Sequence, residues 1–245
     1  MEVRPRNIYG FTIGILMLET RFPRFPGDIG NATTFDFPVR HKVVKGASGD
    51  RAVKVDLTLL DSFIEAGKEL EGEGVRAITT SAGFLSIFQN VMAEALDVPV
   101  FTSSLLQIPM IRKILKPNKR IGIIASNKNM LDEKHLSPVG IEDMGALIIE
   151  GMENEPVWRK RLEYTPADLA SLSTLRTEVE QAVVRICSRM VQTNRDVGAI
   201  VFECTNLPPF SKAVQEATGR PVFDIVTLTK LVHNALEPGC YRGYM

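Results

Sequence analysis

The sequence predicts an α/β protein of two pseudo-symmetric lobes, each a parallel sheet flanked by helices, with the active site in the cleft between them. Short runs rich in Ile and Val alternate with longer stretches of helical period, which is typical of parallel sheets covered by helices. The segment that begins at Val75 repeats at Val197, an offset of 197 − 75 = 122 residues. Without a gap, the same offset pairs Leu85 with Leu207, Phe88 with Phe210, and Pro99-Val100-Phe101 with Pro221-Val222-Phe223. A duplicated half of this kind indicates two lobes that face each other.

The strands are predicted from the buried apolar runs. The first run, Ile8–Leu18, resembles the core of a signal peptide, but it continues into Glu19 without a small-residue cleavage site and is too short to span a bilayer. We therefore interpret it as a buried first strand. The predicted strands are Thr12–Leu18, Val75–Thr80, Val100–Ser103, Arg120–Ser126, Ala146–Glu150, Gly198–Glu203 and Val222–Ile225.

The helices are predicted from apolar residues at helical spacing between these strands. They are Asp56–Glu71, Leu85–Leu96, Leu105–Leu115, Ala167–Thr193, Pro209–Ala217 and Val226–Leu236. The turn-rich, charged segment Lys116–Lys119 is the clearest linker between the two halves.

A change in the repeat offset points to an inserted segment. Ile13 matches Ile121 at an offset of 121 − 13 = 108, whereas the later elements match at 122, a difference of 122 − 108 = 14 residues. We assign this surplus to the first half, where Arg21–Thr34 is rich in Pro, Gly and Asn. A long segment of this composition is often a functional loop, and Arg21–Asn31 is our candidate lid over the cleft.

Composition excludes several classes of function. The chain has 245 residues, 44% hydrophobic and 24% charged, and no formal net charge, so neither a nucleic acid nor an anionic membrane is expected as a partner. Three cysteines at Cys187, Cys204 and Cys240 form neither a disulfide framework nor a zinc motif, which favours a cytoplasmic setting. Phosphate-loop, dinucleotide and metal-ligand motifs are missing from the sequence, and no metal is expected.

Cys204 follows a predicted strand, in the polar turn Cys204-Thr205-Asn206. Loops at the carboxyl ends of parallel strands form the ligand crevice of such sheets. Pro208 and Pro209 suit the start of the next helix, whose free N–H groups attract anions and lower the pKa of a nearby thiol. The structural alternative is that Cys204 is a small buried hydrophobic residue.

The matching loop of the first half carries Ala82 opposite Cys204. Thr80, Ser81 and Gly83 around it supply hydroxyls and a flexible backbone, either to bind a carboxylate or only to cap the next helix. Strand alternation predicts that Glu203 points away from Cys204.

Three further polar residues are candidates for substrate binding. Asp28 and Asn31 lie in the candidate lid, and Ser126 ends a predicted strand on the crevice side. Solvation of the loop and capping of a helix are the alternatives for these three residues.

Several of these features together resemble the aspartate/glutamate racemase superfamily. They are the duplicated strand-loop-helix, the Cys204-Thr205-Asn206 loop, Glu150-Gly151-Met152 after a strand, and the strand Arg120–Ser126. The resemblance covers nearly the whole chain. It implies a cofactor-independent enzyme in which two cysteines flank the substrate Cα; Cys204 matches the second cysteine, and Ala82 stands at the position of the first.

The resemblance also implies the arrangement of the domains. Residues 1–105 would form lobe 1, residues 106–225 lobe 2, and residues 226–245 would pack back onto lobe 1. Family members are often dimers, so the oligomeric state, including a homodimer, is left open. The glycine-rich loop common after the first strand of the family is missing, and Glu19–Asn31 stands in its place.

The function expected from these residues is that of an isomerase of the racemase or epimerase type. It would transfer a proton at the carbon next to the carboxylate of a small acid or amino acid. Thr80, Ser81, Thr205 and Asn206 would hold that carboxylate, and Cys204, with a lowered pKa, would serve as acid or base.

Ala82 leaves the kind of function open. It fits a natural one-thiol protein or a Cys→Ala form of a two-thiol isomerase, of which we favour the second. The alternatives to an isomerase are a one-thiol decarboxylase or lyase of the arylmalonate decarboxylase type, and a non-catalytic small-carboxylate-binding protein.

Overall fold

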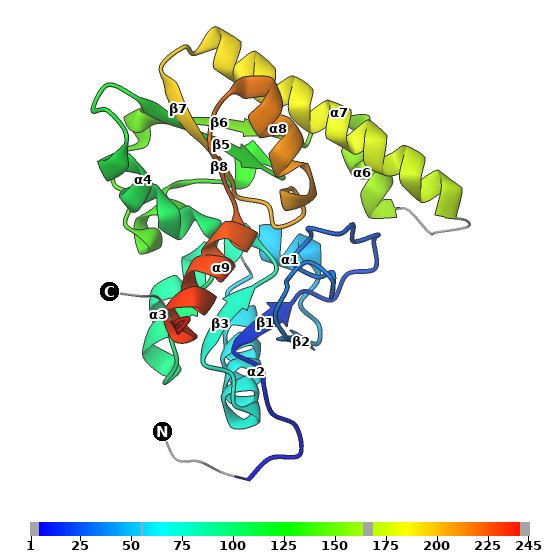
Figure 1. Ribbon diagram of the computed structural model, residues 1–245, viewed down its shortest axis with the longest axis vertical. Coiled ribbons are helices and arrows are strands. Elements are labelled where there is room, and N and C mark those ends of the chain that lie inside the picture. Colours follow the sequence, from blue (N-terminus) through cyan, green and yellow to red (C-terminus); the bar gives the residue numbers. More distant parts are fainter. Residues whose placement is uncertain (1–4, 55, 164–168, 241–245) are drawn as a thin grey trace.

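The computed structural model describes residues 5–54, 56–163 and 169–240 and contains two four-stranded parallel sheets (Figure 1). The strand orders are β2-β1-β3-β4 and β6-β5-β7-β8, so the two halves share one topology, and the predicted α/β fold is confirmed. The strands are β1 Ile13–Met17, β2 Val39–Val43, β3 Ala77–Thr80, β4 Val100–Phe101, β5 Arg120–Ala125, β6 Leu147–Gly151, β7 Val197–Phe202 and β8 Val222–Phe223.

Helices cover both faces of each sheet, as expected for parallel strands that are apolar on both sides (Figure 1). The α-helices are α1 Gly49–Val53, α2 Leu59–Glu73, α3 Gln89–Ala95, α4 Ile108–Ile114, α5 Glu133–Leu136, α6 Pro156–Glu163, α7 Leu169–Thr193, α8 Ser211–Thr218 and α9 Ile225–Leu236. Short 3₁₀ turns precede several of them, and three matter below: η1 Gly83–Phe88, η3 Lys128–Met130 and η6 Pro208–Phe210.

The assignment of the surplus residues to Arg21–Thr34 is wrong. Val39 pairs with β1 as Leu147 pairs with β5, so the offset is still 147 − 39 = 108 at the second strand of each half. The offset reaches 199 − 77 = 122 only at Ala77 and Ala199, and an offset that grows along the chain places the extra residues in the second half. They lie between β6 and β7, where α6 and the 25-residue α7 replace the shorter α1 and α2.

The C-terminal helix α9 leaves the second sheet and packs on the first (Figure 1). Ile225 and Leu228 are buried in one cluster with Ile13, Ile15 and Phe101 of the first half. The predicted packing of residues 226–245 on lobe 1 agrees with these contacts of α9, and residues 241–245 of that segment lie outside the described residues. The predicted boundaries at 105 and 225 remain a prediction.

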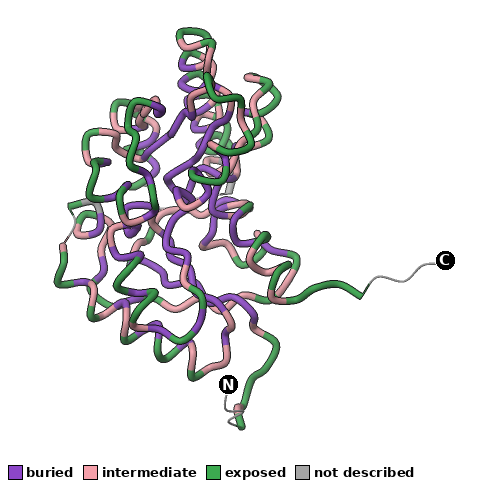
Figure 2. The backbone as a smooth tube through the Cα atoms, turned by 90° about the vertical axis from the view of Figure 1, so that its left-hand side faces the viewer, coloured by how far each residue is buried: buried purple, intermediate pink, exposed green. Residues whose placement is uncertain are grey.

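Burial runs continuously through both halves (Figure 2). The buried segments are the central strands and the loops at their carboxyl ends, and the helices turn exposed faces outward. In the described part of the chain, no helix combines the length and the apolar character needed to cross a membrane.

Candidate active site

A cavity of about 610 Å³ opens between the two sheets, at the carboxyl ends of β1, β3, β5 and β7. Both halves contribute to its wall, as the predicted cleft requires. Among the described residues, no group of three or more His, Cys, Asp or Glu could hold a metal ion. The predicted site residues that line the cavity are Ser81, Ala82, Gly83, Ser126, Cys204, Thr205 and Asn206.

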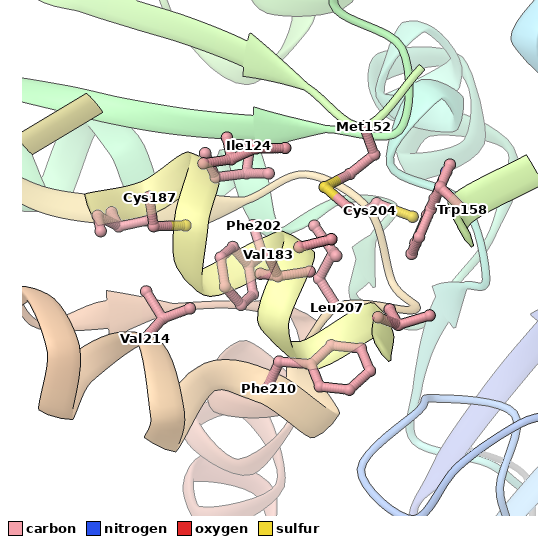
Figure 3. Close-up of a cluster of buried hydrophobic side chains, with 14 of the residues drawn as sticks. Ile124, Met152, Trp158, Val183, Cys187, Phe202, Cys204, Leu207, Phe210 and Val214 are labelled. Atoms are coloured by element: carbon pink, nitrogen blue, oxygen red, sulfur yellow. The ribbon is translucent and has the colours of Figure 1, made fainter. Parts of the chain in front are cut away.

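Cys204 lies just beyond the end of β7 and is 8% exposed. Its Sγ is 3.7 Å from Oδ1 of Asn206, and in Figure 3 it lies beside Met152 and Trp158. Cys187, by contrast, lies at the other end of this cluster, on α7. Cys204 and Ala82, which the repeat places at equivalent positions, line the same cavity in the structure.

The prediction that a helix end lowers the pKa of Cys204 is wrong. Burial, and next the charge of Glu203, raise the pKa of this thiol to about 12, while Arg161 and the backbone N–H of Asn206 lower it by less. The chain after Cys204 forms only the three-residue turn η6 before α8, so the effect of a helix end on the pKa of Cys204 is smaller than the effect of burial. In the ligand-free protein, Cys204 is therefore a neutral thiol at physiological pH.

Arg161 is a site residue that the sequence analysis missed. It is 1% exposed on α6, and its guanidinium lies 4.1 Å from the ring centroid of Trp158 and 4.4 Å from that of Phe22. Its Nη2 donates to Oδ1 of Asn206 at 3.2 Å, while its Nε finds no partner among the described residues. Burial lowers its pKa to about 10, which still leaves a cation at neutral pH with donors to spare for an anionic ligand.

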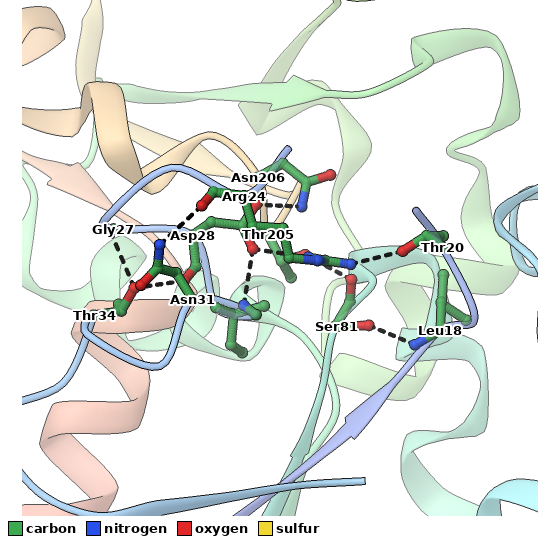
Figure 4. Close-up of polar contacts among 12 residues, drawn as sticks. Leu18, Thr20, Arg24, Gly27, Asp28, Asn31, Thr34, Ser81, Thr205 and Asn206 are labelled. Carbon is green, nitrogen blue, oxygen red and sulfur yellow. Dashed lines mark hydrogen bonds and ion pairs between the residues drawn. The ribbon is translucent and has the colours of Figure 1, made fainter. Parts of the chain in front are cut away.

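The loop between β1 and β2 forms hydrogen bonds and a ring contact with the second half, and its role as a lid remains a prediction. Nδ2 of Asn206 donates to Asp28 at 2.7 Å, and Arg24 donates to the same carboxylate at 2.7 Å (Figure 4). The ring of Phe25 contacts that of Phe210 in the core of the second half. Asp28, which does not itself line the cavity, thus orients Asn206, which does.

The remaining predicted residues have structural hydrogen bonds. The Ser81 hydroxyl accepts from the N–H of Leu18 at 2.8 Å, and the Thr205 hydroxyl donates to the Ser81 carbonyl at 2.6 Å, which joins the two halves (Figure 4). Thr80 donates to a backbone carbonyl at 2.7 Å, and Asn31 donates to another within its own loop at 2.8 Å. The cavity wall, as far as the structure describes it, includes neither Thr80 nor Asn31.

Glu203 lines the same cavity as Cys204, contrary to the prediction from strand alternation. Its Oε2 accepts from the N–H of Ser126 at 3.3 Å. Gly83 makes room for it, because a Cβ at that position would lie 2.2 Å from the Glu203 carbonyl oxygen and 2.3 Å from Oε1.

Replacing Gly83 with alanine is expected to destabilise the protein by about 1–3 kcal/mol, because the new methyl group overlaps a backbone atom that cannot move freely. The free energy of unfolding in urea measures the effect. Gly72→Ala is the matched control, since Gly72 is exposed on α2 and no described atom lies within 4 Å of its Cβ position, and it should be neutral or stabilising. Equal stability of the two variants would contradict the close approach of Glu203.

The fold has counterparts of known structure. Arylmalonate decarboxylase superposes with a TM-score of 0.56 at 14% identity, covering 96% of this chain and 95% of that one. An aspartate racemase homologue from Pyrococcus horikoshii gives 0.54 at 16% over 92% and 99%, and a glutamate racemase from Bacillus anthracis gives 0.55 at 13% over 93% and 83%. The chain therefore has the fold of the aspartate/glutamate racemase superfamily, as its sequence indicated.

Sequence relatives are more specific about function. No protein-family model matches the chain. A dimethylsulfoniopropionate lyase from Durusdinium is 28% identical over 227 residues, which is 90% of this chain and 73% of that protein. Dimethylsulfoniopropionate lyases 7 and 6 of Emiliania huxleyi are 28% and 29% identical over 222 residues, 88% of this chain. The chain spans only 64% and 57% of the length of these two.

These relatives confirm the expectation of an enzyme and overturn the expectation of an isomerase. Each is named as a lyase, although the fold is shared with racemases. The prediction of racemase or epimerase chemistry is therefore wrong, and the one-thiol lyase considered beside it agrees better with the relatives.

Proposed function

We propose that this chain is a lyase that eliminates dimethyl sulfide from dimethylsulfoniopropionate. The observation that carries the proposal is that Cys204 and the buried cation Arg161 line one cavity and meet at the same atom, Oδ1 of Asn206. The proposed substrate is the one named for the lyase relatives, which match along 88–90% of the chain. A thiol beside a buried guanidinium suits a substrate with a carboxylate next to an acidic carbon.

The reaction needs one base and one anchor for the carboxylate. The Cys204 thiolate takes a proton from the carbon next to the carboxylate, and the electron pair of that C–H bond forms the double bond. The bond from the neighbouring carbon to the sulfonium sulfur breaks, and its electron pair leaves with dimethyl sulfide. Acrylate remains, and the proton ends on the Cys204 sulfur.

Arg161 supports the reaction by stabilising negative charge. As the proton leaves, charge builds up on the substrate carboxylate, and the Nε–H of Arg161, which has no partner in the described part of the chain, is available to bind it. The substrate itself supplies a cation. A sulfonium group bound near the thiol favours the thiolate and offsets the burial that raises the pKa of Cys204 in the empty cavity.

Ala82 is consistent with elimination. An isomerase must return a proton to the opposite face of the carbon, whereas an elimination removes a proton and returns none. The proposed reaction therefore needs no second thiol at position 82, where the methyl group of Ala82 lines the cavity. It leaves space on that side of the cavity for the substrate.

Incubation of the protein with dimethylsulfoniopropionate tests the proposal. We expect dimethyl sulfide in the headspace by gas chromatography and an equal amount of acrylate by proton NMR. The Cys240→Ser variant, altered at an exposed cysteine, should match the wild type. If the wild type releases no more dimethyl sulfide than buffer does, the proposal fails; carbon dioxide from an arylmalonate would then indicate a decarboxylase.

A further inference from the structure

Glu203 places a carboxyl group of the second half against the first half. It follows β7 directly and is 1% exposed, and its side chain reaches the start of η1, where Gly83 makes room for it. Position 82, which faces Cys204 in the repeat, is the neighbour of Gly83. The carboxyl group of Glu203 therefore lies near Ala82, the position at which the resemblance places the first cysteine.

The two carboxyl oxygens of Glu203 have different surroundings. Oε2 accepts a hydrogen bond from the N–H of Ser126, whereas Oε1 is buried and has no hydrogen-bond partner among the described residues. An unsatisfied buried oxygen is costly, and in a cavity wall it indicates a missing ligand atom. Because Oε2 already accepts, a proton on the carboxyl group belongs on Oε1.

The surroundings of Glu203 favour its neutral form. Burial raises its pKa to about 8, against smaller opposing effects of the Ser126 and Phe84 N–H groups. Gly83–Phe88 carries no titratable side chain, although His135 packs at the edge of Phe84. Lys128, in η3, is paired with Glu150. The ionisable residues of the second half that line the cavity with Glu203 are Glu153, Arg159, Arg161 and Cys204.

We propose that Glu203 is a second catalytic residue, which donates a hydrogen bond from Oε1–H to the substrate carboxylate as that group becomes an enediolate. This inference rests on the proposed lyase function. Arg161 would then bind the developing charge as a cation and Glu203 as a neutral acid, while Cys204 removes the proton. Glu203 keeps its own proton throughout, so the balance of the elimination does not change.

A pair of substitutions separates a hydrogen-bond donor from a base. Glu203→Gln keeps an acceptor for Ser126 and an N–H donor in place of Oε1–H, and we expect kcat for dimethyl sulfide release within about tenfold of the wild type. Glu203→Met keeps the length without a donor and should lower kcat about 10²–10³-fold, the usual cost of losing one such donor. Thermal unfolding of both variants checks that they fold.

The pH profile gives a second readout. Below pH 8, kcat/KM of the wild type should rise about tenfold per pH unit as Cys204 ionises, and it should level off above about pH 8 as Glu203 loses its proton. In Glu203→Gln the rise should continue beyond pH 8. A Gln variant as inactive as the Met variant would show that Glu203 is a base, and two fully active variants would show a structural role; either result overturns the inference.

Binding of propionate, which has no leaving group, tests the inference apart from turnover. Trp158 lines the cavity and is the one tryptophan in the sequence, so its fluorescence reports occupancy. The wild-type affinity should fall about tenfold per unit above pH 8, while that of Glu203→Gln should not. If the wild type is inactive on dimethylsulfoniopropionate but its propionate binding still differs from that of Glu203→Gln in this way, only the proposed lyase function fails. If the two binding profiles are identical, the proposed role of Glu203 fails.

Discussion

Replacing Cys204 with alanine should reduce dimethyl sulfide release by about 10⁴-fold or more. The thiolate is the proposed proton acceptor, and loss of a residue that takes part directly in bond breaking usually costs at least this much. The expected loss lies in kcat, because the carboxylate anchor is left in place. Steady-state assays of dimethyl sulfide release, with purified wild type and variant, measure the change.

Cys187→Ala is the matched control for this experiment. Cys187 is also a buried cysteine, but it lies on α7 and not in the cavity wall, and burial alone raises its pKa to about 12. Its replacement should lower stability somewhat and leave kcat nearly unchanged. A Cys204→Ala variant with a tenth or more of the wild-type kcat would exclude Cys204 as the base.

Replacing Arg161 with methionine should lower kcat/KM about 10²–10³-fold. The substitution removes a buried cation that binds the substrate carboxylate, an interaction of about 3–5 kcal/mol when one partner of a buried charge pair is lost. Methionine keeps an unbranched, uncharged side chain at this buried position, but not the guanidinium that lies over the rings of Phe22 and Trp158. Since Arg161 lowers the pKa of Cys204, the rising limb of the pH profile should also move to higher pH.

The size of this loss should depend on the charge of the substrate. A methyl ester of dimethylsulfoniopropionate should show a much smaller difference between the wild type and Arg161→Met, because it carries no carboxylate for Arg161 to bind and only the effect of Arg161 on the pKa of Cys204 remains. Arg185→Met, which removes an exposed arginine that is paired with Glu155 on the outer surface, should match the wild type. An unchanged kcat/KM in Arg161→Met would contradict the carboxylate anchor.

Most of the fold could be predicted from the sequence because buried parallel strands appear as continuous apolar runs. The predicted strand Thr12–Leu18 corresponds to β1, and Gly198–Glu203 corresponds to β7. The edge strand β2 was missed because its three central residues are polar or charged and none of its five residues is fully buried. The short helix α6 was missed because half of its eight residues are charged and so short a segment gives no apolar period.

The site could be predicted only where the repeat marks it. Comparison of the two halves located Cys204 and Ala82 at equivalent positions, and both line the cavity. Arg161 lies on α6, which stands in the place of α1 of the first half, and neither of these two short helices was predicted, so the repeat gave no comparison there. Its one sequence signal is the spacing of three residues that places it on the same helix face as Trp158.

The pKa of Cys204 could not be predicted from the sequence either. Sequence reasoning weighs the local effect of a helix end, whereas the desolvation that raises this pKa depends on the whole surrounding fold.

The return of α9 to the first sheet determines how chimeras of this enzyme would have to be built. A gene cut once, within Lys116–Lys119, would encode a first half without Ile225 and Leu228, and the apolar face around Ile13 would meet water. Exchange of the second half between relatives therefore needs two crossover points, one in that linker and one at Asp224, which connects β8 to α9. Recombination at both points would transplant Cys204, Glu203 and Arg161 together.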